Sequence, residues 1–182
     1  LLKNLSKHQI QIISSGGTFK EIKKLGYKCL EISKYTGSKE ILNGRVKTLH
    51  PKIHAGILSI RKNKSHIRDL KKNSFGEIDL VIVNFYPFEK ALKNKNNHKS
   101  IIENIDIGGP TMVRAAAKNF NDVTVITDPN QYDNLIEELN SNNSKTTLEF
   151  RQKMSEVAFA ETAYYDGLIA NYFNSKSKTL FP

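Results

Sequence analysis

The sequence predicts an α/β sandwich of three layers, built on a mostly parallel sheet. Two observations indicate this class. Short, apolar, β-branched runs at residues 9–14, 27–32, 79–85 and 123–127 are typical of strands. Segments with helical spacing separate them, which favours right-handed parallel crossovers. In such a sheet ligands bind beyond the carboxyl ends of the strands, so we expect the functional residues there.

The first predicted unit is a strand, a glycine turn, a helix and a second strand. Residues 9–14 run into Ser15-Gly16-Gly17-Thr18, and apolar residues then recur every three positions until Gly26. Residues 33–60 have no clean period and are interrupted by Asn43-Gly44 and His50-Pro51, which predicts a long functional loop.

The second half predicts two buried strands and several helices. Residues 79–85 and 123–127 are continuous apolar runs that end at Pro87 and Asp128-Pro129, as expected of parallel strands buried on both faces. We expect helices at residues 66–72, 99–104, 110–119, 129–140 and 147–173. Residues 1–173 then form one domain, and the polar tail 174–182 is predicted to be a linker.

Composition restricts the class of protein. A chain of 182 residues fits one domain, and no apolar run approaches the roughly 20 residues needed to span a bilayer, so we expect a soluble protein without a membrane partner. The single cysteine, Cys29, can form neither an intrachain disulfide nor a cysteine-based zinc site, which fits a cytoplasmic location.

The net charge of +10 raises the alternative of a nucleic-acid partner. The basic residues, such as Lys20, Lys62 and Lys93, are spread along the chain among asparagines, and no aromatic stacking pattern accompanies them. This distribution predicts a solvated surface and no nucleic-acid binding.

The Ser15–Thr18 segment is a candidate phosphate site. Its two glycines let backbone amides approach an anion at the start of a helix, whose dipole favours negative charge, and hydroxyls flank them. The competing interpretation is a simple tight turn between strand and helix.

Residues 43–54 concentrate cations and imidazoles. If the segment is extended, Arg45 and Lys47 point the same way, because side chains alternate with a period of two. A solvated basic loop, with His50 and His54 as hydrogen-bonding packers, explains the pattern equally well. A zinc site is a poor interpretation, since no further ligand lies at a useful spacing.

Residues 105–111 place Asp106 before Gly108-Gly109, with Pro110 at the start of a helix where its missing N–H costs nothing. Free amides there could stabilise an oxyanion, with Asp106 as a base beside them, and Lys118 lies four residues after Arg114 on one helix face. Taken alone, the segment is better explained by Asp106 as a capping group and Lys118 as a solvated side chain.

Together, the order and the amino-acid sequences of these segments resemble the cyclohydrolase half of the bifunctional enzyme that performs the last two steps of purine synthesis. The similarity runs from about Leu5 to Tyr172. It is carried by Ser15–Thr18, Gly44–Lys52, Asn84–Phe88, Glu103–Pro110 and Arg114–Asn119. The resemblance implies a methylglyoxal-synthase-like fold, with inosine monophosphate (IMP) cyclohydrolase activity and neither metal nor organic cofactor.

Two departures accompany this resemblance. Members of the family begin with an additional strand and a Ser-Asp-Lys-Thr-Gly loop that helps to hold the substrate phosphate, whereas this chain starts inside the helix that follows. The family also continues beyond Pro182 into a formyltransferase domain. We therefore expect a sequence cut at both ends, with part of its phosphate site missing.

The resemblance also implies the site and the partners. The catalytic residues would be Lys47, Tyr86, Asp106 and Lys118. The nucleotide would be bound by Arg45, Thr48, Asn84, Ile107, Gly108 and Gly109, and its phosphate by Ser15, Gly17 and Thr18. The expected partners are a small purine nucleotide precursor, the formyltransferase domain of the parent chain, and a second copy in a homodimer.

We expect the four catalytic residues to converge on one pocket, because a shared reaction requires proximity. Two alternatives with the same fold are a methylglyoxal-synthase-type lyase acting on a triose phosphate and a non-catalytic nucleotide-binding effector domain. The Arg45–Pro51 and Asn84–Phe88 segments argue against the lyase. An effector domain would have no use for Asp106 and Lys118 as a catalytic pair.

Overall fold

The computed structural model describes residues 1–93 and 97–177. Its first unit is α1 (Leu2–Lys7), β1 (Ile13–Ser14), α2 (Gly16–Lys24) and β2 (Leu30–Glu31). The two strands pair in parallel, with Ile13 opposite Leu30. The strand, turn, helix and strand order predicted from the sequence is confirmed, although each strand is shorter than its apolar run.

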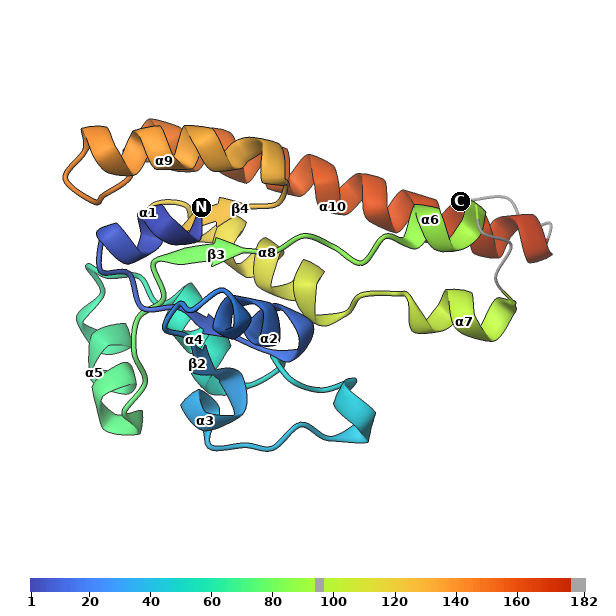
Figure 1. Ribbon diagram of the computed structural model, residues 1–182, viewed down its shortest axis with the longest axis horizontal. Coiled ribbons are helices and arrows are strands. Elements are labelled where there is room, and N and C mark those ends of the chain that lie inside the picture. Colours follow the sequence, from blue (N-terminus) through green and yellow to red (C-terminus); the bar gives the residue numbers. More distant parts are fainter. Residues whose placement is uncertain (94–96, 178–182) are drawn as a thin grey trace.

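The second unit contains β3 (Leu80–Ile82) and β4 (Thr124–Ile126), which also pair in parallel with Val81 opposite Val125. Between them in sequence lie α6 (Phe88–Lys93), α7 (His98–Glu103) and α8 (Gly108–Lys118), and after them η2 (Pro129–Gln131), α9 (Tyr132–Ser141) and α10 (Leu148–Ser177). In Figure 1, α9 and α10 lie on one side of the β3–β4 pair and α4 (Pro51–Leu58) on the other. The predicted α/β architecture is confirmed.

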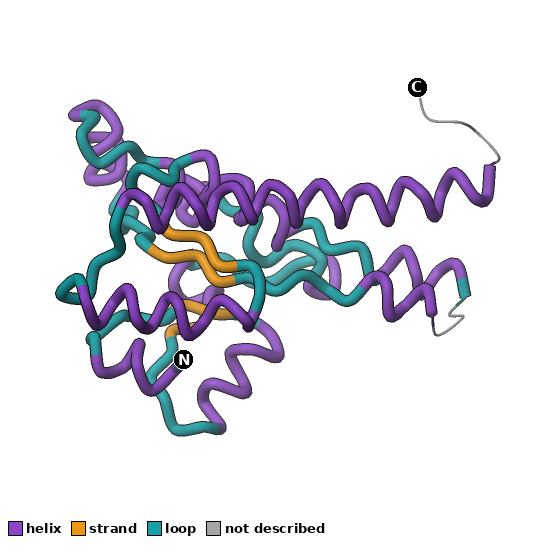
Figure 2. The backbone as a smooth tube through the Cα atoms, turned by 90° about the horizontal axis from the view of Figure 1, so that it is seen from above, coloured by secondary structure: helices purple, strands orange, loops and turns teal. Residues whose placement is uncertain are grey.

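The sheet differs from expectation in one respect. The described strands form two separate parallel pairs, β1–β2 and β3–β4, which Figure 2 shows as two distinct groups. A cavity of about 720 Å³ lies between them, lined by Ile10 and Ile13 of the first unit and by Leu80 and Ile82 of the second. The inner edges of β1 and β3 therefore have no strand partner in the described part of the chain.

The long loop predicted at residues 33–60 is partly wrong. This stretch contains the end of α3 (Ile32–Thr36), the short 3-10 helix η1 (Leu42–Gly44) and all of α4. His50-Pro51 begins a helix: Pro51 occupies its first turn, and Nδ1 of His50 accepts a hydrogen bond from the backbone N–H of Lys52 at 3.1 Å. Ile53 and Ile57, four residues apart, are buried and anchor α4 to the core.

Two hydrophobic clusters hold the fold together. The larger surrounds the β3–β4 pair and includes the small residues Ala115, Ala116 and Ala117 of α8, which allow close packing against α10. The smaller contains Phe88 of α6, Ile101 of α7 and Tyr165 of α10, and it fixes the segments that follow β3. α5 (Lys64–Asn73) contributes no residue to either cluster, although its Leu70 is buried.

The end of the chain is only partly described. α10 continues through Ser177, so the first residues of the predicted 174–182 linker are helical, and 178–182 lie outside the described residues. The division into a domain and a linker stays a prediction. Within the described ranges, no helix is long and apolar enough to cross a bilayer.

Candidate active site

The glycine turn places the beginning of α2 directly after β1. Ser15 is extended (φ −135°, ψ 166°), and its side chain makes no capping hydrogen bond. Gly16 adopts φ +54°, a left-handed conformation that glycine enters without strain. The first N–H groups of a helix have no intrahelical acceptor, so α2 presents free amides and the positive end of its dipole.

Lys47 lies beside this helix end. A Cβ built on Gly16 would stand 3.4 Å from Nζ of Lys47. The ammonium also forms an ion pair with Glu40 at 3.5 Å, and only 27% of the Lys47 side chain is exposed. Lys47 therefore brings the 40–47 loop next to the glycine turn at the start of α2, although the two segments are distant in sequence.

A tight turn sets the position of Lys47. Ile41 and Val46 form an antiparallel bridge, and Leu42, Asn43 and Gly44 between them all have left-handed φ values of 53°, 55° and 84°. Such conformations cost non-glycine residues about 1–3 kcal/mol and persist where surrounding structure imposes them. A Cβ on Gly44 would approach Cε of Lys47 to 2.6 Å. Any larger residue at position 44 would therefore clash with the Lys47 side chain in its present position.

The Asp106 carboxylate lies at the N-terminus of α8. Its Oδ1 accepts a hydrogen bond from the backbone N–H of Gly109 at 2.9 Å, and the backbone N–H of Tyr86 also donates to the carboxylate. Burial raises the pKa of Asp106, and these two hydrogen bonds oppose the rise. Asp106 therefore caps the helix, as the simpler interpretation predicted, and also has the raised pKa of a candidate base.

The 45–48 loop adjoins the same helix end. The Thr48 hydroxyl lies where a Cβ on Gly108 would be, so glycine is required for this close approach. Nε of Arg45 lies 3.7 Å from a Glu103 carboxylate oxygen at the end of α7, in an exposed pair. Thr48 and Gly108 thus join the loop of Lys47 to the turn of Asp106.

Two large apolar side chains lie exposed beside these polar groups. Tyr86 is 54% exposed and Ile107 is 58% exposed. Asn84, two residues after β3, donates from Nδ2 to the hydroxyl of Tyr132 at 3.1 Å. We call the set Ser15–Thr18, Arg45–Thr48, Tyr86 and Asp106–Gly109 the candidate site; it lies at the carboxyl ends of β1 and β3.

Lys118 does not belong to this site within one chain. It is the exposed last residue of α8, whereas Asp106 precedes the first turn. α8 has 11 residues and is about 15 Å long at 1.5 Å per residue. The neighbouring Asn119 side chain donates hydrogen bonds to the backbone carbonyls of Ile57 and Ser59 at the C-terminal end of α4. Within one chain, Lys118 thus lies at the far end of α8 from Asp106, and its place in the catalytic group stays a prediction.

Sequence reasoning missed three side chains near the site: Glu40, Glu103 and Tyr165. Glu40 and Tyr165 belong to no motif, and Glu103 begins the Glu103–Pro110 segment without a predicted role of its own. The fold brings all three near the site. The interpretation of His50 as a hydrogen-bonding packer is confirmed. Nε2 of His54, in contrast, is buried without a hydrogen-bond partner, and burial lowers the pKa of this imidazole.

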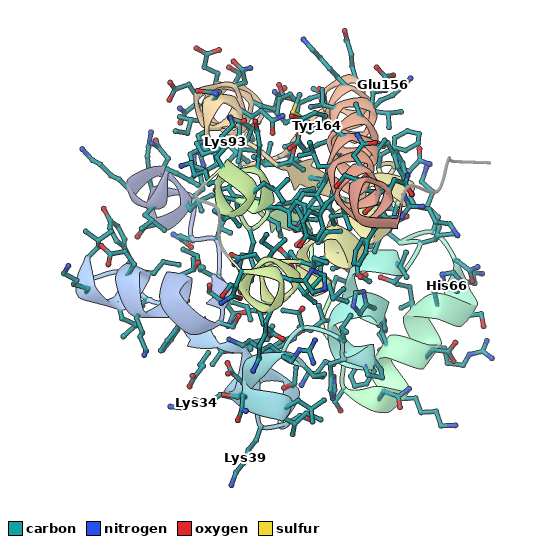
Figure 3. All side chains as sticks on the ribbon, turned by 90° about the vertical axis from the view of Figure 1, so that its right-hand side faces the viewer. Lys34, Lys39, His66, Lys93, Glu156 and Tyr164 are labelled. Atoms are coloured by element: carbon teal, nitrogen blue, oxygen red, sulfur yellow. The ribbon has the colours of Figure 1, made fainter. Side chains whose placement is uncertain are left out.

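The remaining basic residues are scattered. Figure 3 shows Lys34 and Lys39 projecting at one side of the molecule and Lys93 of α6 at another. Among the described residues, no group of three or more His, Cys, Asp or Glu side chains could hold a metal ion.

Two protein-family models match the chain. The family model described as the MGS-like domain matches residues 1–111, and the model described as the AICARFT/IMPCHase bienzyme matches residues 116–182. The chain belongs to the family of MGS-like domains.

Its curated relatives share one description. The chain is 51% identical over 95% of its length to the bifunctional purine biosynthesis protein PurH of Rippkaea orientalis. It is 52% identical over 93% to PurH of Prochlorococcus marinus strain NATL2A, and 46% identical over 94% to PurH of Bradyrhizobium diazoefficiens. It spans about a third of these relatives, 34%, 32% and 32% respectively. The motif-based resemblance is confirmed.

A solved structure has the same fold. The crystal structure of ForH superposes with a TM-score of 0.82 and 29% sequence identity, covering 95% of this chain and 89% of that one. The methylglyoxal-synthase-like fold expected from the motifs is confirmed.

Proposed function

We propose that this chain is an IMP cyclohydrolase, which closes 5-formamidoimidazole-4-carboxamide ribonucleotide to IMP with loss of water. The observation that carries the proposal is Asp106. It is a half-buried carboxylate with a raised pKa, held between the amides of Tyr86 and Gly109, beside the loop of Lys47 and Thr48. The relatives' description as purine biosynthesis proteins supports the same reaction.

The reaction is intramolecular. The carboxamide nitrogen attacks the formyl carbon and forms a C–N bond. The carboxamide nitrogen and the formamide nitrogen each give up one proton, and the formyl oxygen accepts both and leaves as water. A C=N bond between the former formyl carbon and the formamide nitrogen completes the ring. Holding both groups in the attacking rotamer removes much of the entropic barrier, since oriented intramolecular reactions reach effective molarities of about 10⁵ M or more.

Each part of the site has a proposed task. The free amides of Gly16, Gly17 and Thr18 hold the phosphate, with Ser15 beside them. Asp106 accepts the carboxamide proton, while the amide of Gly108 stabilises the developing oxyanion. Lys47 and Tyr86 orient the carboxamide and share its charge. Arg45, Thr48, Asn84, Ile107 and Gly109 complete the nucleotide site.

The geometry of one chain gives Lys118 none of these tasks. We therefore propose that Lys47, whose ammonium lies within the candidate site, protonates the formyl oxygen. We propose a cytoplasmic enzyme whose parent chain also carries a formyltransferase domain and associates as a homodimer.

The test is to incubate the protein separately with the formylated nucleotide and with dihydroxyacetone phosphate. We expect IMP to form in the first reaction and no methylglyoxal in the second. Methylglyoxal formation would identify a lyase instead. Nucleotide binding without turnover, in a protein whose Asp106→Asn variant binds equally well, would identify an effector domain.

A further inference from the structure

Tyr165 of α10 is a buried residue that forms a hydrogen bond with the backbone of the candidate site. Its side chain is 5% exposed, and its hydroxyl accepts a hydrogen bond from the backbone N–H of Asp106 at 2.9 Å. The same hydroxyl donates to the carbonyl of Asn104 at 3.3 Å. One side chain therefore fixes the backbone on both sides of Ile105. This restricts the orientation of the Asp106 side chain.

The ring of Tyr165 also contacts the other segment that contributes to the site. It packs on Phe85 with centroids 5.0 Å apart and against Phe88 with centroids 6.2 Å apart in an edge-on arrangement. Phe85 and Phe88 flank Tyr86-Pro87 in sequence. The hydroxyl end thus holds the Asp106 turn while the ring holds the Tyr86 segment.

The state of the hydroxyl suits this double role. Burial raises the pKa of Tyr165, and the nearby carboxylates of Asp106 and Asp166 raise it further, against the effect of the Asp106 amide. The phenol therefore keeps its proton at neutral pH, so it can donate to Asn104 while it accepts from Asp106.

We propose that Tyr165 is a positioning residue for cyclisation, which fixes the position of the Asp106 carboxylate relative to the Tyr86 segment. This inference rests on the proposed function. Misplacing a reacting group by about 1 Å can cost 10²-fold in rate, so a hydroxyl that fixes the base acts on turnover without touching the nucleotide.

The test compares Tyr165→Phe with two control variants. Tyr164→Phe changes the exposed neighbouring residue, and Ser155→Ala removes another buried hydroxyl of α10, which donates to the carbonyl of Ala117 at 2.8 Å. For Tyr165→Phe we expect kcat to fall about tenfold with KM unchanged, as the loss of one buried hydrogen bond predicts. Ser155→Ala should lose comparable thermal stability and keep its kcat. A kcat for Tyr165→Phe within twofold of that for Ser155→Ala would overturn the proposal.

A second readout does not depend on activity. Amide hydrogen exchange of Asp106, measured by NMR, should accelerate at least tenfold in Tyr165→Phe and stay unchanged in Tyr164→Phe, because only the first loses the acceptor of that N–H. Unchanged exchange would contradict the positioning role. If the wild-type protein forms no IMP, the proposed function fails, and the exchange measurement alone decides whether Tyr165 positions Asp106.

Discussion

At the scale of single residues, Asp106 is subject to opposing influences. Burial favours its neutral form, whereas the N–H groups of Gly109 and Tyr86 favour the carboxylate. The outcome is a pKa above that of an ordinary aspartic acid, which brings the base closer to working pH. A base with a higher pKa accepts a proton from a carboxamide more readily, provided that it is still ionised.

Replacing this base is the first prediction. Asp106→Asn keeps the side-chain volume and an oxygen for the Gly109 amide but cannot accept the carboxamide proton. We expect kcat to fall by about 10²- to 10⁴-fold, with a much smaller change in KM. Steady-state kinetics on the formylated nucleotide measure both constants. Asp133→Asn, an exposed aspartate in the first turn of α9, is the control and should retain full activity.

The second prediction concerns pH. Because Asp106 must be deprotonated to act, the cyclisation rate should fall as pH drops through its raised pKa, in a range where an ordinary aspartate is still ionised. Log kcat plotted against pH should rise with unit slope and then level off. A profile that stays flat down to the ordinary pKa of aspartic acid, near 4, would show that Asp106 is not the base.

At the scale of elements, glycines decide how closely the segments of the site approach. A Cβ on Gly109 would overlap the Asp106 carboxylate and come within 3.0 Å of Cγ1 of Val83. Gly109→Ala should therefore displace Asp106 and lower both kcat and stability.

Gly167 lies inside α10, where a Cβ would meet no atom within 4 Å. Gly167→Ala should keep its activity and gain up to about 1 kcal/mol, which chemical denaturation would measure.

Prediction of the elements from sequence succeeded where apolar residues repeat. The β3 and β4 runs were recognised because continuous apolar residues mark strands that are covered on both sides. α4 was missed because Pro51 was interpreted as a break, although a proline in the first turn is a common helix start. The pairing of Glu40 with Lys47 and the contact of Tyr165 with Asp106 depend on tertiary packing, which no local pattern reports.

The position of Lys118 also depends on the fold. The resemblance groups Lys118 with Asp106 because the two would share one reaction. Within one chain, helix α8 separates them and places them at its opposite ends. The contact between Thr48 and Gly108, in contrast, joins segments that are far apart in sequence, and shared membership of a family pattern was the signal that grouped them.

At the scale of the whole molecule, a cavity of about 720 Å³ separates the two strand pairs. The resemblance implies an additional strand followed by a Ser-Asp-Lys-Thr-Gly loop. We predict that adding this segment before Leu1 raises stability, because a strand in the cavity would pair with the free edges of β1 and β3. Thermal denaturation of the extended and present chains measures the gain.

The same extension should increase nucleotide affinity. Two additional charge-assisted hydrogen bonds to the phosphate, at about 1.5–3 kcal/mol each, correspond to roughly two to four orders of magnitude in Kd. An extension that carries the strand but a Gly-Ser loop is the control, and it should gain stability without the full gain in affinity. Equal affinity in the extended and present chains would show that the phosphate is held elsewhere.

The most direct test of the central claim is a titration of the isotope-labelled protein with IMP, followed through its backbone amide signals. The account predicts that the amides of Gly16, Gly17 and Thr18 shift together with those of Gly108 and Gly109 and fit one dissociation constant, because phosphate and base occupy one site. Asp106→Asn should bind IMP with similar affinity and fail to form it. Shifts confined to α5, or separate dissociation constants for the two glycine segments, would contradict the account.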